Sequence, residues 1–157
     1  MRTIEATPAA AGLCVAVVVS KYHDFITDRL QAGALAALAK AGVASRKITL
    51  VTVPGAFEIS LAAQQAARTK RYDAVVCLGC LIRGATAHFE YIASAVSHGI
   101  TAAAAATGVP IAFGVLTTNS VEEAIERAGE GPANKGWEAA MAAVEMASVI
   151  RQLKKKT

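Results

Sequence analysis

The chain has 157 residues, of which 54% are apolar, 5% aromatic and 18% charged, which suits one globular domain over residues 1–157 and excludes a disordered chain. The formal net charge is +4, but Lys154–Lys156 carry three of the positive charges, as at a solvated helix end, and no basic patch alternates with aromatic residues, so we expect no nucleic-acid partner. No apolar run suits a membrane span and no signal-peptide core precedes the first apolar run, so we expect a cytoplasmic protein without membrane contact.

Apolar, β-branched runs alternate with helical patterns after an extended N-terminal segment, residues 1–12. The runs are nearly continuous, which indicates strands buried on both faces of a parallel sheet. We expect strands at Leu13–Val19, Lys47–Val53, Ala74–Cys80 and Val109–Leu116. We expect helices at Asp24–Ala41, Phe57–Arg68, His88–Thr107, Val121–Arg127 and Asn134–Lys154. This order predicts an α/β layered fold with right-handed crossovers.

Helix-capping residues support these boundaries. Ser120 and Glu123 form a capping-box pattern at the start of the fourth helix. Gly42 and Gly129 follow helical patterns, where a left-handed C-terminal cap is favoured.

Ligands of parallel α/β sheets bind beyond the carboxyl ends of the strands. The segments that leave the expected strands there read "SKYHD" (20–24), "PGAFE" (54–58), "CLIRGATAH" (80–88) and "TTNS" (117–120). Three of the four carry groups suited to binding or catalysis. The candidate site therefore draws on segments that are far apart in the sequence.

The segment around Thr86 suits an anion. Gly84, Ala85 and Thr86 precede a helix whose free backbone N–H groups attract phosphate, although Thr86 could equally be a plain N-cap. His88 follows and could move protons near neutral pH, or be an ordinary surface histidine. Position at a strand end favours His88 and His23 over the third histidine.

Other polar side chains near the strand ends have two interpretations each. Arg83 could bind an anion or be solvated. Glu58 could accept hydrogen bonds from substrate hydroxyls or complement a helix dipole. Tyr22 could stack on a planar ring or cap the edge of the core.

Two motifs fall short of known patterns. Gly79–Thr86 resembles a phosphate-binding loop but has an alanine in place of the essential lysine. Cys77 and Cys80 form a C-x-x-C inside a strand, without a second pair to complete a zinc site, and we interpret them as small buried apolar residues. The odd total of three cysteines argues against a disulfide framework.

Taken together, these segments resemble the lumazine synthase family. The matching pieces occur in the family's order and spacing, from about Leu13 to Arg151, and read "VPGAFEIS", "GCLIRGATAHFEYI", "GVPIAFGVLTT", "EEAIERAG" and "NKGWEAAMAAVEM". The resemblance implies a flavodoxin-like three-layer sandwich around a four-stranded parallel sheet. It also implies a ring of five identical subunits, with each active site between two neighbours.

The resemblance implies a reaction as well. Family members condense 5-amino-6-(D-ribitylamino)uracil with L-3,4-dihydroxy-2-butanone 4-phosphate to 6,7-dimethyl-8-ribityllumazine, a step of riboflavin biosynthesis that releases phosphate. The family uses no metal and no organic cofactor. The partners implied are therefore the two small-molecule substrates and neighbouring identical subunits.

Site residues follow from the same resemblance. His88 matches the residue that transfers protons, and Phe113 and Arg127 match residues that a neighbouring subunit contributes. Lys135 is expected to assist with charge. The residues that match pyrimidine- and ribityl-binding positions are Tyr22, Ala56, Phe57, Glu58, Cys80, Leu81, Ile82 and Phe113. The residues that match phosphate-binding positions are Ala85, Thr86 and Arg127.

The sequence departs from the family pattern at three places. His23 stands where many relatives have Asn, which adds a titratable group near the pyrimidine pocket. Tyr22 stands where many have Phe or Trp. Pro132 stiffens a loop that differs from the one found in sixty-subunit shells, so we expect a free pentamer. Two alternatives to the enzyme remain open: a flavin-binding paralogue with little turnover, and a structural shell protein.

Overall fold

Strands and α-helices alternate in the computed structural model, which describes residues 1–155; Lys156 and Thr157, the end of the expected lysine tail, lie outside the described residues. The strands are β1 (Val15–Ser20), β2 (Ile48–Val53), β3 (Ala74–Ile82) and β4 (Ile111–Thr118). The α-helices are α1 (Asp24–Lys40), α2 (Ile59–Arg68), α3 (His88–Thr107), α4 (Val121–Arg127) and α5 (Lys135–Lys154). Short 3-10 turns are η1 (Ser45–Lys47), η2 (Ala56–Glu58) and η3 (Gly131–Ala133).

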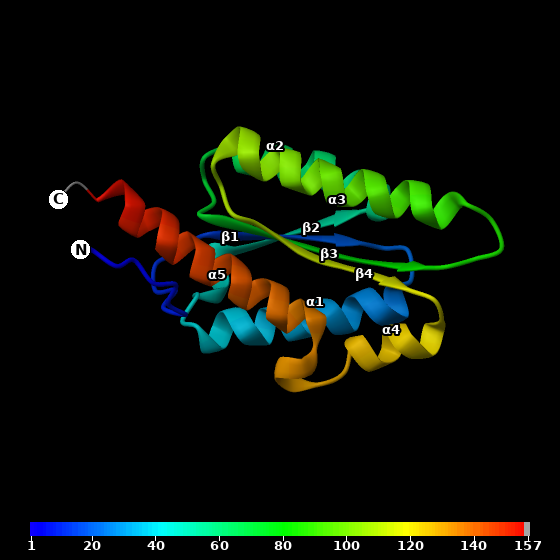
Figure 1. Ribbon diagram of the computed structural model, residues 1–157. Helices are drawn as coiled ribbons and strands as arrows, with labels where there is room; N and C mark the ends of the chain where they lie inside the picture. Colours follow the sequence, from blue (N-terminus) through cyan, green and yellow to red (C-terminus); the bar gives the residue numbers. More distant parts are fainter. Residues whose placement is uncertain (156–157) are drawn as a thin grey trace.

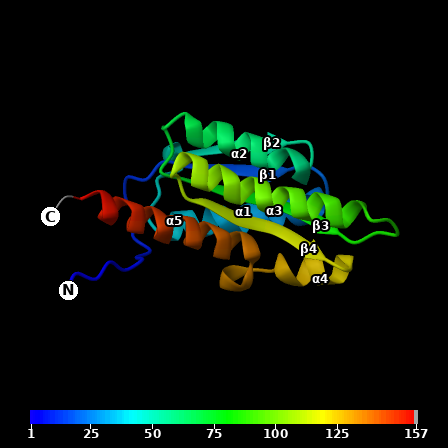
Figure 2. The ribbon, with the colours of Figure 1, turned by 45° about the horizontal axis from the view of Figure 1, so that its top comes forward.

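The four strands form one parallel sheet in the order β2-β1-β3-β4. Helices α2 and α3 cover one face, and α1, α4 and α5 lie on the other, so the fold has three layers (Figures 1 and 2). The chain changes direction across the sheet between β1 and β3, which is where ligands bind in folds of this type. The sheet order and layers confirm the flavodoxin-like α/β sandwich.

The sheet is held by apolar residues on both faces. Every residue of β1 is buried, as the continuous run "VAVVVS" requires for a central parallel strand. Val15, Val17 and Val19 join the core against α1 and α5, whereas Ala16 and Val18 join the core against α2. Full burial of a valine side chain contributes about 1.5–3 kcal/mol, so these two cores fix the register of the strands.

Element boundaries agree with the sequence patterns at most positions. The Ser120 hydroxyl accepts a hydrogen bond from the Glu123 amide at 3.2 Å, which confirms the N-cap, while the Glu123 carboxylate accepts from Asn119 rather than from Ser120. Gly42 is left-handed as expected, with φ of 95°. The prediction for Gly129 was wrong, because the left-handed glycine of that loop is Gly131, with φ of 68°.

Predicted boundaries near the strand ends also need correction, including the carboxyl end of β4, which lies at Thr118 and not at Leu116. Helix α2 begins at Ile59 and not at Phe57, since η2 occupies Ala56–Glu58. Strand β3 continues past Cys80 to Ile82 because β4 remains paired with it as far as Thr118.

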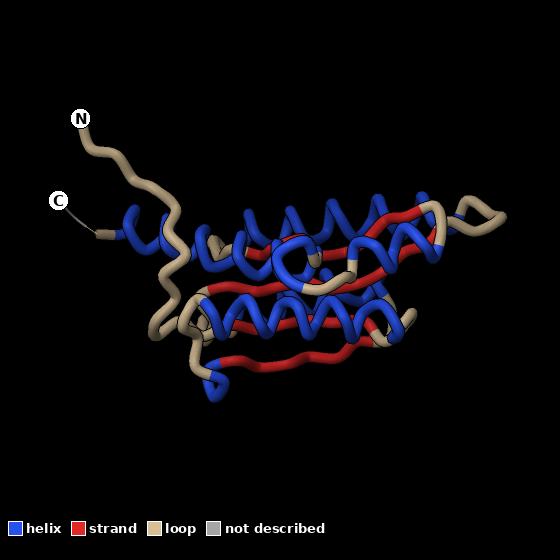
Figure 3. The backbone as a smooth tube through the Cα atoms, turned by 90° about the horizontal axis from the view of Figure 1, so that it is seen from below, coloured by secondary structure: helices blue, strands red, loops and turns tan. Residues whose placement is uncertain are grey.

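Residues 1–10 contain neither helix nor strand and lie beside the C-terminal half of α5 (Figure 3). The Arg2 guanidinium donates to the Gln152 carbonyl at 3.1 Å, and the Gln152 amide donates to the Glu5 carbonyl at 2.8 Å. Further along, the Ala10 amide donates to the Ala41 carbonyl at 3.1 Å, and Ala10 is buried. These contacts join the N-terminal segment to α1 and α5.

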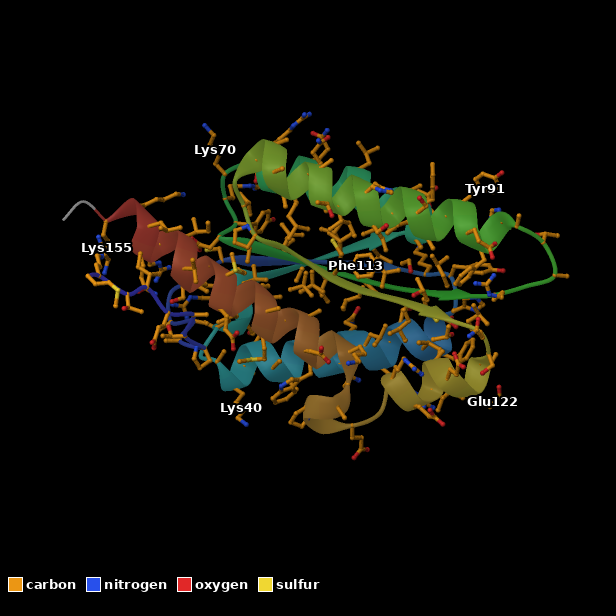
Figure 4. All side chains as sticks on the ribbon, viewed as in Figure 1. Lys40, Lys70, Tyr91, Phe113, Glu122 and Lys155 are labelled. Carbon is orange, nitrogen blue, oxygen red and sulfur yellow. The ribbon has the colours of Figure 1, made fainter. Side chains whose placement is uncertain are left out.

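Figure 4 shows Lys70 and Lys155 at one end of the molecule, with Tyr91 and Glu122 at the other. Lys154 and Lys155 are exposed at the end of α5, which confirms the solvated helix end for the described lysines. Within residues 1–155, none of the helices combines the length and apolar character that a membrane span needs.

Candidate functional site

A cavity of about 740 Å³ opens at the carboxyl ends of β1, β2 and β3. We call it the strand-end cavity. Its lining residues are Tyr22, His23, Gly55, Ala56, Phe57, Glu58, Cys80, Leu81, Ile82, Gly84, Thr86, His88, Phe89, Ile92 and Val121. It lies where the crossover direction changes, as expected for a ligand site in a parallel α/β sheet.

The η2 turn places Phe57 and Glu58 at this cavity. Pro54 and Gly55 end β2, and the chain turns through Ala56–Glu58 before α2 begins. A Cβ atom at position 55 would lie only 3.1 Å from the Glu58 carboxylate. Glycine at this position therefore leaves room for the carboxylate. Glu58 makes no side-chain capping hydrogen bond to α2 and lines the cavity, a position compatible with both the hydroxyl-acceptor and the helix-dipole interpretations.

Tyr22 and His23 form the β1 side of the cavity. Tyr22 is 67% exposed, so it does not cap the core edge as the alternative interpretation required. Its ring lies edge-on to the His23 ring at 4.5 Å. His23 is left-handed, with φ of 61°, a conformation in which Asn is better accommodated than most residues. Burial lowers the pKa of His23, so this imidazole is neutral above its ordinary value of 6.5.

The turn from Arg83 to Ala87 projects beyond the sheet and delivers His88 as the first residue of α3 (Figure 2). Ala87 is the N-cap and no side chain caps the helix, so Thr86 is not the N-cap that the plain interpretation required. The uncapped N–H groups, the Thr86 hydroxyl and the exposed imidazole thus share one rim. Such a helix terminus is suited to an anion.

Arg83 is engaged within the chain. Its Nε donates to Asn119 Oδ1 at 3.0 Å, its guanidinium pairs with Glu90, and it lies 4.6 Å from the centre of the Phe89 ring. A hydrogen bond from the residue's own amide, followed by the Arg83 guanidinium, lowers the pKa of Glu90. Arg83 is therefore not simply solvated; it ties the start of α3 to the β4–α4 connection.

The C-x-x-C motif is structural. Both cysteines are buried, and they lie on opposite faces of β3, because side chains three residues apart in a strand alternate. Burial raises the pKa of Cys77 to about 12 and that of Cys80 to about 11. Both thiols are thus protonated at neutral pH. This agrees with the interpretation of Cys77 and Cys80 as small buried apolar residues.

A second cavity, of about 350 Å³, lies between the outer strand β4 and the start of α5. We call it the edge cavity, and its lining residues are Ala112, Phe113, Gly114, Val115, Leu116, Thr117, Arg127, Lys135, Glu138, Ala139 and Ala142. Phe113 is 45% exposed. Lys135 Nζ lies 2.5 Å from the Glu138 carboxylate, and Arg127 donates to the Glu123 carbonyl at 3.0 Å. The edge cavity thus gathers two cations, one carboxylate paired with Lys135, and an exposed aromatic ring.

The structure divides the predicted site residues between these two cavities. Phe113, Arg127 and Lys135 line the edge cavity, whereas the others, except Ala85, line the strand-end cavity. Ala85 lies in the Arg83–Ala87 turn without lining either one.

Sequence reasoning missed several lining residues. Phe89 and Ile92 follow His88 on α3, and Ile92 is one helical turn away, so helical periodicity could have identified it. Glu138 is three residues from Lys135, the spacing of a side-chain pair on a helix. Val121 had no signal, because only the fold brings α4 to this cavity.

The fold and the strand-end cavity define an α/β protein with a small-molecule site beyond the carboxyl edge of its sheet. The sequence model of the family described as "6,7-dimethyl-8-ribityllumazine synthase" matches residues 12–151. Two relatives bear this name: one from Syntrophus aciditrophicus (strain SB), 53% identical over 92% of this chain and 94% of its own length, and one from Desulfatibacillum aliphaticivorans, 47% identical over 98% and 99%. The chain belongs to the 6,7-dimethyl-8-ribityllumazine synthase family.

Proposed function

We propose that the strand-end cavity of one chain and the edge cavity of a second copy form one composite active site. The chain is an enzyme of the lumazine synthase family, which condenses 5-amino-6-(D-ribitylamino)uracil with L-3,4-dihydroxy-2-butanone 4-phosphate. The products are 6,7-dimethyl-8-ribityllumazine, phosphate and water. A site for this reaction must bind a planar pyrimidine, a polyhydroxyl chain and a phosphate together.

The distribution of charge between the two cavities carries this proposal. The strand-end cavity has aromatic rings, a carboxylate and imidazoles, but no lysine or arginine among its described lining residues. The edge cavity of the same chain has Arg127 and Lys135. Since a leaving phosphate is best held by charge-assisted hydrogen bonds, the site is complete only when a second chain supplies them.

Within the composite site, Tyr22 stacks on the pyrimidine ring from one side and the other copy's Phe113 covers it. Ala56 and Phe57 line the ribityl chain, and Glu58 accepts hydrogen bonds from its hydroxyls. The backbone from Cys80 to Ile82 reads the edge of the pyrimidine. Orienting both reactants in this way supplies part of the acceleration.

His88 transfers protons during catalysis. The aryl amine attacks the ketone to give an imine, phosphate leaves, and the ring closes, and each of these steps moves protons. An imidazole is suited to both directions of transfer and typically contributes about a hundredfold or more. Thr86, the turn at Ala85 and the amides of α3 hold the departing phosphate together with Arg127.

We propose that the assembly is a ring of five copies. Contact between two different surfaces of one chain is heterologous, and repetition of such a contact closes into a ring or extends into a filament. The exposed apolar residues Leu61 and Tyr91, 64% and 76% accessible in the isolated chain, provide further surface for it. We also propose a cytoplasmic location, because a reducing compartment keeps the free cysteines as thiols.

The enzyme is tested by mixing the purified protein with both substrates and following lumazine fluorescence, while sedimentation measures the assembly. We expect turnover by a pentamer. Tight riboflavin binding without turnover would instead indicate the flavin-binding paralogue, and a sixty-subunit particle would indicate a shell.

A further inference from the structure

We propose that Asn134 is a positioning residue for the edge cavity. Its side chain fixes the loop between α4 and α5 so that Arg127, before the loop, and Lys135, after it, face the same space. This role rests on the proposed function of the edge cavity in phosphate binding.

Asn134 uses both ends of its side-chain amide. Its Oδ1 accepts from the backbone amides of Gly136 at 2.8 Å and Trp137 at 3.2 Å, which caps α5. Its Nδ2 donates to the Gly129 carbonyl at 2.7 Å and to the Arg29 carbonyl at 3.1 Å. One side chain therefore connects the loop after α4, the first half of α1 and the start of α5.

The surroundings of Asn134 fit this side chain closely. Asn134 is 2% exposed, a rare degree of burial for an asparagine. A side chain at Gly33 of α1 would collide with the Asn134 amide, and one at Gly136 would collide with the backbone of Leu30. Both glycines allow α1 and the start of α5 to approach closely, which keeps the amide away from water.

The loop between α4 and α5 depends on these side-chain hydrogen bonds because its own backbone is conformationally unrestricted. It contains Gly129 and the left-handed Gly131, both with low conformational restriction. Its other fixed element is the short turn η3. Gly129 lies two residues after Arg127, so the hydrogen bond from Nδ2 holds the backbone just after α4. The hydrogen bonds to Oδ1 hold the first turn of α5, which begins with Lys135.

Asn134→Asp separates the two functions of the amide. Aspartate keeps the oxygen that caps α5, but it has no N–H for Gly129 and Arg29 and brings a negative charge towards their carbonyls. The control is Leu38→Ala, which removes buried carbon near the other end of α1, where Leu38 is fully buried. If Asn134→Asp does not fold, Asn134→Ser replaces it, since one hydroxyl cannot serve the cap and both carbonyls.

Three measurements on the full chain test the role. We expect Asn134→Asp to raise KM for the phosphate substrate roughly tenfold, with kcat and KM for the pyrimidine changed less than about twofold. Inhibition by inorganic phosphate should weaken by a similar factor. Hydrogen exchange of residues 127–135 should accelerate about tenfold or more. Leu38→Ala should lower stability without any of these changes.

Each outcome decides the proposal. A wild-type KM for the phosphate substrate in Asn134→Asp, unchanged exchange in 127–135, or the same pattern in Leu38→Ala would overturn the positioning role while the enzyme assignment stands. A wild-type protein that makes no lumazine would instead overturn the proposed function, and this role with it.

Discussion

The strand-end cavity and the edge cavity differ in the chemistry of their side chains. The first has His88, Glu58 and the rings of Tyr22 and Phe57. The second has Arg127 and Lys135 beside Phe113. The strand-end cavity is suited to moving protons and binding a planar reactant, and the start of α3 offers it amides for an anion. Only the edge cavity adds cationic side chains for that anion. Neither has the full set of groups that a condensation with loss of phosphate requires.

The difference lies in where the fold places each group. The strand-end cavity is built by turns that leave the sheet at its carboxyl edge, whereas the edge cavity lies along an outer strand and the start of the last helix. In the proposed assembly, these separate positions become adjacent between neighbouring copies. We therefore expect variants of the two cavities to show different kinetic signatures.

The largest effect is expected for His88→Ala. Loss of the proton-transfer group should lower kcat about a hundredfold, with the fold intact because His88 is exposed at the first position of α3. Steady-state lumazine fluorescence and circular dichroism check this prediction. His98→Ala, which removes an exposed histidine in the middle of the same helix, is the control. A loss of only two- or threefold in His88→Ala would contradict the assignment.

A smaller effect, mainly on KM, is expected for Arg127→Ala. A charge-assisted hydrogen bond contributes about 1.5–3 kcal/mol, so KM for the phosphate substrate should rise roughly 10- to 100-fold with little change for the pyrimidine. Arg46→Ala, at an exposed arginine in η1, should leave kinetics unchanged.

Mixing the two variants sharpens the comparison. In rings reassembled from equal amounts of His88→Ala and Arg127→Ala chains, about a quarter of the contacts should pair an intact strand-end cavity with an intact edge cavity. Activity at low phosphate-substrate concentration should recover accordingly. Mixtures no more active than the average of their parents would show that each site lies within one chain.

The substitution His23→Asn tests the strained residue of the strand-end cavity. Asn tolerates the left-handed conformation better than His, so the free energy of unfolding should rise by about 0.5 kcal/mol. Because burial lowers the pKa of His23 below 6.5, the unfolded chain binds more protons, and wild-type stability should fall as pH drops below that value. The variant should lose this component, which urea unfolding between pH 5 and 8 would reveal. An identical pH dependence of stability in both proteins would exclude a contribution from His23.

A similarly small effect is expected for Glu138→Gln in the edge cavity. Its ion pair with Lys135 is largely exposed, so stability should change by less than about 1 kcal/mol. Freeing Lys135 should lower KM for the phosphate substrate by no more than about threefold. A large rise in KM would show that Glu138 itself orients the substrate.

The sequence predicted the sheet and its helices because continuous β-branched runs and helical periodicity are local signals. Its errors occurred where strand pairing or an unrecognised short turn decides a boundary. Pairing with β4 lengthens β3 to Ile82, and the tight turn after Gly55 delays α2 to Ile59.

The candidate site was only partly open to sequence reasoning. Residues that leave the strands, such as Glu58 and His88, could be identified as candidates from their position, whereas their roles came from the family resemblance. Arg127 and Lys135 could be assigned only through family resemblance, since nothing local indicates that they share a cavity with Phe113. The engagement of Arg83 by Asn119 and Glu90 depends on tertiary contacts that no pattern contains.

Trp137 is the single tryptophan of the chain, and its backbone amide belongs to the cap that Asn134 makes. The centre of its indole ring lies 5.4 Å from the ammonium of Lys40, at the end of α1. The emission of this one fluorophore therefore reports on the α4–α5 connection without an attached label. Rapid-mixing fluorescence could thus follow, in real time, how the loop beside the edge cavity responds to each reactant.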